Sequence, residues 1–217
     1  GWDELVQPAL ELQREDIARI DRRVAWINGI KSESVFHGEV LRDYIEEILP
    51  VKEWAELRLP LQVNAVDLET GYTVWFGTDA RTDVSLADAV YASAALPVYY
   101  PPARIDGDHF VDGGVGDALA LHRGADMGAS GLVAVDVGSG PEGDADAVVD
   151  QGMVGIYQRV YAIMSGWRRR QTVEDWDRIP LVLVRPRLAG YSTFDFHAVK
   201  YFLEEGYRAT RQALSEV

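Results

Sequence analysis

The sequence contains no cysteine among its 217 residues. This absence excludes disulfide bonds, catalysis by a thiolate and zinc sites built on cysteine. Histidine is scarce as well, and the spacing of the four residues does not match a helical metal-binding pair. They are His37, His109, His122 and His197. We therefore expect neither a metal ion nor a cofactor in this protein.

The sequence is also poor in positive charge. It has 21 Lys and Arg against 35 Asp and Glu, which gives a net charge of −14. Such a surface repels the phosphate backbone of nucleic acids, so we expect no nucleic-acid partner. The sequence also lacks an apolar run of about 18 residues, the length that spans a bilayer. Its start does not resemble a signal peptide. These features predict a cytoplasmic protein whose contact with a membrane is at most peripheral.

One basic cluster, Trp167-Arg168-Arg169-Arg170, interrupts the acidic composition. Docking on an anionic membrane would require a patch of this kind. The alternative is a solvated helix face on which these arginines pair with Glu174 and Asp175. We favour the solvated face and keep peripheral membrane contact as the second interpretation.

Hydrophobic periodicity predicts an alternation of helices and strands. The predicted helices cover residues 2–27, 38–49, 85–96, 117–127, 148–174 and 195–217. The predicted strands cover residues 61–68, 72–76, 132–137 and 181–184, with a small hairpin over 104–111. The two later strands are almost continuously apolar, which predicts that both of their faces are covered. The pattern favours an α/β layered fold with a largely parallel central sheet, in one domain spanning residues 1–217.

The most informative short motif is Asp112-Gly113-Gly114, directly after a strand of the hairpin. Two glycines predict a sharp bend with a positive φ at one of them. The bend would hold the carboxylate at the edge of the sheet, where α/β proteins keep their sites. Asp112 is then a general base or orients a nucleophile, and the plain alternative is a simple Asp-Gly turn. No Gly-x-Ser-x-Gly motif and no Ser-His-Asp triad is visible.

Residues 86–115 resemble patatin-like phospholipases. Leu86–Pro97 matches the family's helix that ends in Ala-Ser-x-Ala-x-Pro, and Tyr100-Pro101-Pro102 and Phe110–Val115 match its next elements in order. The similarity runs from about Phe36 to the end of the chain and is most specific over residues 86–115. Its closing helix resembles that of bacterial members, including those akin to neuropathy target esterase.

The resemblance implies a three-layer patatin-like hydrolase fold and ester hydrolysis by a Ser-Asp dyad. Asp112 matches the dyad aspartate, and Gly113 and Gly114 form the turn that supports it. The aspartate would accept the serine proton, and an acyl-enzyme would then be hydrolysed by water. The implied substrate is a lipid or another acyl ester. From their apolarity and position, we expect four residues to line its pocket: Leu96, Val98, Tyr99 and Tyr100.

The family's nucleophilic serine and its Gly-rich oxyanion loop lie upstream of the matched elements and are not found in this sequence. We therefore expect that the N-terminal strands of the sheet are missing from this chain. An N-terminal fragment of the same protein would then be a partner that completes the site. The alternative is a non-catalytic lipid-binding or interaction module that retains the fold without the nucleophile.

Overall fold

The computed structural model describes residues 2–20, 33–138, 144–191 and 193–216. The chain divides into two compact units, one of residues 12–117 and one of residues 1–11 together with 118–217. Both units combine helices with strands, so the predicted α/β class is confirmed. That the chain forms one domain stays a prediction.

The unit of residues 12–117 contains a four-stranded sheet in the order β2-β1-β4-β3. Its strands are β1 (Gln62–Asp67), β2 (Thr73–Gly77), β3 (Ala103–Ile105) and β4 (Asp108–Asp112). Every pairing in this sheet is antiparallel, so the largely parallel central sheet that we predicted is not confirmed. The reason is local, because the short turns between β1 and β2 and between β3 and β4 can join only antiparallel neighbours. Asp106 and Gly107 form the second turn with φ values of 54° and 97°.

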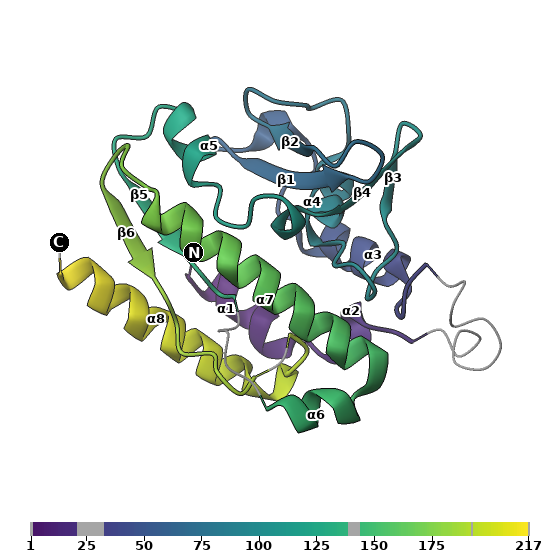
Figure 1. Ribbon diagram of the computed structural model, residues 1–217. Helices are drawn as coiled ribbons and strands as arrows, with labels where there is room; N and C mark the ends of the chain where they lie inside the picture. The colour runs from purple at the N-terminus through teal and green to yellow at the C-terminus, as the bar shows by residue number, and fades with distance from the viewer. Residues whose placement is uncertain (1, 21–32, 139–143, 192, 217) are drawn as a thin grey trace. The chain divides into compact units, whose positions relative to one another are not determined.

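Helix α4 (Leu86–Ala94) contacts β1 and β4, and α3 (Gly38–Ile48) contacts α4 (Figure 1). Small side chains allow α4 to approach the sheet closely, because Ala89, Ala92 and Ala95 are fully buried. Phe76 and Phe110 meet edge to face with ring centroids 5.8 Å apart and fill the core. Three short elements complete this unit: α2 (Arg14–Ile17) and the 3₁₀ turns Trp54–Glu56 and Gly113–Val115.

The other unit is built on two parallel strands, β5 (Leu132–Val135) and β6 (Leu181–Val184). Helix α5 (Leu121–Asp126) contacts β5, and α8 (Val199–Ser215) contacts both β6 and α1 (Trp2–Glu11). The crossover between the strands carries α6 (Ala145–Asp150) and α7 (Gly152–Glu174), and a 3₁₀ turn, Phe196–Ala198, precedes α8. In the part of the chain that the structure describes, no helix has the length and apolarity that a bilayer crossing needs.

Several predicted boundaries are wrong. The first helix ends at Glu11, because the backbone N–H of Gln13 bonds the Asp16 carboxylate at 2.8 Å and starts α2 as a new helix. Its predicted end near residue 28 lies outside the described residues. The helix predicted for 117–127 is shorter in the structure. It begins only after Ala120, whose φ of 52° is not helical. The predicted long helix divides into α6 and α7 at Gly152, which has a φ of 69°.

Strand β5 is not covered on both faces in the described structure. Val133 and Val135 are 57% and 51% exposed, whereas Ala134 between them is buried. Side chains alternate between the two faces of a strand, so one face of β5 packs inward and the other is open.

The N-terminus of α4 gives a test of this architecture. The Ser85 hydroxyl accepts a hydrogen bond from the Asp88 backbone N–H at 3.0 Å and so caps the helix. We expect Ser85→Ala to lower the free energy of unfolding by about 1 kcal/mol, because one backbone donor loses its partner. Urea denaturation measures the change, and Ser85→Thr, which keeps the hydroxyl, is the control. An unfolding midpoint unaffected by Ser85→Ala would show that the cap contributes nothing.

Candidate functional site

The backbone of Asp112 is held from two sides. Asp112 is the last residue of β4 and pairs with Ala65 of β1. Its backbone N–H donates to the carbonyl of Ala95, at the end of α4, with an N–O distance of 3.0 Å. The chain then turns into the 3₁₀ turn Gly113–Val115. A helix end and a neighbouring strand therefore fix the position from which the carboxylate projects.

The Asp112 carboxylate uses one oxygen to stabilise the bend. Its Oδ1 accepts a hydrogen bond from the Gly114 backbone N–H at 2.7 Å. Among the described residues, no cation forms an ion pair with Asp112 and Oδ2 accepts no hydrogen bond. Burial raises the pKa of Asp112 above the ordinary aspartate value, and the Gly114 hydrogen bond opposes part of that rise. A carboxylate in this environment holds a proton more tightly than one on the surface, which suits a proton acceptor.

Strand β1 lies so close to Gly113 that this position has no room for a side chain. A Cβ at this position would lie 2.3 Å from the backbone oxygen of Asn64 and 2.4 Å from its Oδ1. The predicted positive φ is wrong, because neither Gly113 nor Gly114 is among the positive-φ residues of the described chain. Close backbone approach, rather than an unusual backbone angle, requires glycine here.

Asn64 is a supporting residue that the sequence analysis missed. Its Nδ2 donates to the carbonyl of Asp117 at 2.9 Å and, at 3.4 Å, to the carbonyl of Gly113. The amide thus bridges the two ends of the bend from the neighbouring strand. A polar residue within the apolar run Val63-Asn64-Ala65-Val66 was the available signal.

The segment after α4 carries backbone strain. Val98 has a φ of 75°, a conformation that β-branched residues rarely adopt and that costs about 1–3 kcal/mol. Two backbone hydrogen bonds hold it, from Val35 N–H to Val98 O and from Phe36 N–H to Tyr99 O, both at 2.8 Å. Strain of this kind collects at functional sites.

Tyr99 and Tyr100 are buried within the same unit. The Tyr99 ring stacks on Phe36 with centroids 5.7 Å apart, and the Tyr100 hydroxyl donates to the Ile17 carbonyl at 3.0 Å. Burial raises the pKa of each tyrosine to about 12, so both hydroxyls are neutral at physiological pH. Leu96 and Val98 are half-buried. A role of these four residues in substrate binding stays a prediction.

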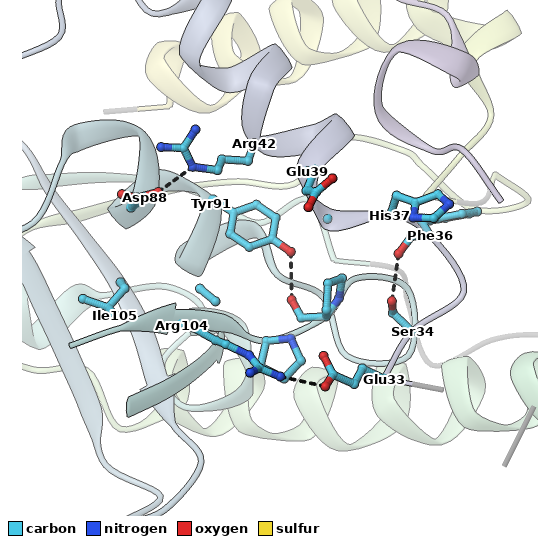
Figure 2. A pocket seen from close by; sticks show the side chains of 14 residues that line it. Glu33, Ser34, Phe36, His37, Glu39, Arg42, Asp88, Tyr91, Arg104 and Ile105 are labelled. Carbon is cyan, nitrogen blue, oxygen red and sulfur yellow. Dashed lines mark hydrogen bonds and ion pairs between the residues drawn. The ribbon is translucent and has the colours of Figure 1, made fainter. Parts of the chain in front are cut away.

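A cavity of about 470 Å³ lies beside α3 and α4 (Figure 2), and neither Asp112 nor residues 96–100 line it. Its charges are largely matched in pairs. Arg42 bonds Asp88 at 2.6 Å, and Arg104 bonds Glu33 at 2.8 Å. Burial acts to raise the pKa of Asp88, but hydrogen bonds from Arg42 and Ser85 outweigh it and the pKa is lowered. This ionic cavity does not have the character of an acyl-chain pocket.

His109 lies on the exposed side of the β3–β4 hairpin opposite Arg104, and His122 packs its ring against Trp176. Among the described residues, no cluster of three His, Asp or Glu side chains could hold a metal ion.

The contact between Gly113 and Asn64 predicts a large effect of one methyl group. Gly113→Ala places its Cβ against β1, so either the strand or the bend must move. We expect a loss of roughly 1–3 kcal/mol in unfolding free energy, the usual cost of overpacking. Urea denaturation measures it. Gly131→Ala, whose Cβ would meet only ordinary contacts of 3.6 Å and 3.9 Å, is the control. Equal effects of the two substitutions would contradict the close approach.

Burial of Asp112 predicts how Asp112→Asn changes stability with pH. Because the folded-state pKa is raised, native Asp112 favours folding below its unfolded pKa and loses that contribution as pH rises through the folded pKa. The melting temperature of Asp112→Asn relative to the native protein should therefore increase between pH 4 and pH 7. Asp67→Asn is the control with the opposite sign, since hydrogen bonds from Glu69 and Thr70 lower the pKa of Asp67. A flat or falling difference for Asp112→Asn would show that its carboxylate is not desolvated.

Comparison with known proteins places these elements in a family. A sequence model described as patatin-like phospholipase matches residues 3–123, a stretch that includes α4, the four-stranded sheet and Asp112. Uncharacterised NTE family proteins of Mycobacterium tuberculosis and Mycobacterium bovis are each 29% identical to this chain over 121 residues. That alignment covers 54% of this chain and 32% of each relative, so the match spans about a third of their length. Since the family match extends over more than half of its residues, the chain belongs to the patatin-like phospholipase family.

Proposed function

We propose that this protein is a lipid acyl hydrolase, a phospholipase or carboxylesterase, in which Asp112 accepts the proton of a nucleophilic serine. Family membership supports the hydrolysis of lipid esters. The observation that carries the role of Asp112 is its environment: a half-buried, partly desolvated carboxylate with one oxygen hydrogen-bonded to Gly114 and the other without a hydrogen bond among the described residues.

The proposed reaction has two steps. As the serine oxygen bonds to the acyl carbon, its proton passes to Asp112 Oδ2. The ester C–O bond then breaks, and the leaving alcohol takes that proton. Water next attacks the acyl-enzyme and gives a proton to Asp112. The bond between the acyl carbon and the serine oxygen then breaks, the serine oxygen takes that proton back, and the fatty acid is released. In the family, the serine and the oxyanion donors lie upstream of the elements that this sequence matches. We propose that they come from that upstream segment and not from residues 1–217.

Two features of the site support the role of Asp112 as the proton acceptor. The raised pKa of Asp112 improves proton acceptance. The hydrogen bonds from Asp112 N–H to the Ala95 carbonyl and from Asn64 Nδ2 to the Gly113 carbonyl fix the backbone of the bend while the proton moves. The strained segment at Val98 follows directly after Ala95 in the chain. We propose that Leu96 and Val98 contact the acyl chain, with Tyr99 and Tyr100 as the packed layer behind them.

The proposal is tested on the intact protein with a fluorophosphonate probe and a short-chain nitrophenyl ester. We expect probe labelling and ester hydrolysis in the native protein. Asp112→Asn should lower kcat/KM by roughly 10²–10⁴-fold, the usual contribution of a general base. Asp108→Asn, at the exposed start of the same strand, is the control and should retain activity. Native protein that neither labels nor hydrolyses would favour the non-catalytic lipid-binding module.

A pH profile distinguishes a proton acceptor from a residue that only shapes the bend. If Asp112 is the base, kcat/KM falls as pH decreases through its raised pKa, with a midpoint above the ordinary aspartate value of about 3.9. Residual activity of Asp112→Asn should lack this acidic limb. An identical limb in the variant would assign the proton transfer to another group.

A further inference from the structure

A second cavity, of about 490 Å³, lies within the unit that carries β5 and β6. Its walls come from α7 and from the segments that follow β5 and β6. Among the described residues, its lining includes one carboxylate, Asp136, and four arginines: Arg169, Arg170, Arg185 and Arg187. Arg169 and Arg170 belong to the basic cluster Trp167–Arg170, and the fold places Arg185 and Arg187 at the same cavity.

The single carboxylate is already engaged. Asp136 Oδ1 forms an ion pair with Arg169 Nε at 2.8 Å, and the exposed fractions of the two side chains are only 9% and 12%. Arg185 lies 3.4 Å from the other oxygen of Asp136. With Asp136 committed to Arg169, the lining carries an excess of positive charge from Arg170, Arg185 and Arg187, although the whole chain has a net charge of −14.

The acidic side chain beside the cavity does not offset this excess. Glu205 of α8 accepts two hydrogen bonds from Arg208 and one from the Arg187 backbone N–H, all at 2.7 Å. These bonds lower the pKa of Glu205 to about 2, so it stays charged and bound to Arg208. Its effect on Arg187 is to position the backbone at the cavity wall.

The rest of the lining is apolar. Ile163, Trp167, Pro186 and Leu188 line the cavity beside the arginines. Trp167 is 63% exposed, and the Arg170 guanidinium lies over its ring at 4.9 Å from the centroid. Apolar exposure continues along α7 at further side chains: Met153, Ile156, Val160 and Met164. The cavity therefore joins cationic groups to an exposed apolar helix surface.

We propose that this cavity binds the phosphate headgroup of an anionic lipid in a membrane surface. Guanidinium groups match phosphate oxygens through paired hydrogen bonds, and an exposed tryptophan suits the membrane interface. The apolar walls favour a lipid over a soluble phosphate, which would use the arginines alone. The inference does not rest on the proposed hydrolase function, because every lining residue belongs to the unit without Asp112.

The test is co-sedimentation of the intact protein with vesicles of phosphatidylcholine, with and without ether-linked phosphatidic acid, which has no carboxylic ester to hydrolyse. We expect binding only to the anionic vesicles. Arg185→Gln/Arg187→Gln should weaken it by on the order of tenfold or more, the scale for two charges at an anionic surface. The control, Arg58→Gln/Arg211→Gln, removes two exposed charges that do not line the cavity. Circular dichroism verifies the fold of both variants.

Other outcomes would overturn the proposal. Equal losses in the two double variants would mean attraction by overall charge, and no binding of native protein to anionic vesicles would exclude a lipid site. Inorganic phosphate that binds as tightly as the vesicles in calorimetry would assign the cavity to a soluble anion. Asp112→Asn should bind the vesicles as the native protein does, so failure of the hydrolase proposal leaves this result unchanged. Loss of binding in Asp112→Asn would place the lipid at the proposed catalytic centre instead.

Discussion

The hydrogen bond from the Asp112 amide to the Ala95 carbonyl joins the end of a strand to the end of a helix, and the candidate site depends on it. Helix α4 can supply that carbonyl only because its buried alanines let it lie close to β1 and β4. On the other side, Asn64 of β1 bonds the backbone carbonyl of Gly113. The carboxylate is thus positioned by residues that are far apart in the sequence. A change in packing at Ala95 or at Asn64 would therefore displace it directly.

The simple-turn interpretation of Asp112 and the catalytic one are compatible, because the carboxylate has two oxygens. One stabilises the bend through Gly114, while the other has no hydrogen bond among the described residues. The negative charge of Asp112 is partly desolvated and therefore lowers the stability of the folded state, in agreement with its raised pKa. Val98, strained nearby in the sequence, adds a second local cost. Two unfavourable features in adjoining segments are what a site selected for chemistry would show.

Features encoded by neighbouring residues were predictable. Ser85 and Pro97 bracket α4, and Asp106-Gly107 defines the hairpin turn, so these elements lie within about two residues of their predicted positions. Features that need a distant partner were not. Periodicity cannot tell which strand pairs with β1, so the antiparallel order was missed. Asn64 meets the bend only after folding, and Arg169, predicted on a solvated face, finds Asp136 from another strand end.

Strand β5 has an unpaired edge in the described structure as well as an open face. In the described structure β5 pairs with β6 alone, and Val133 and Val135 are exposed on one of its faces. Charged residues next to such strands normally act as gatekeepers against aggregation. Asp136 occupies that position, but it is turned into its ion pair with Arg169 and does not serve this purpose. The other edge of β5, unpaired among the described residues, therefore leaves backbone groups to which a further strand could add.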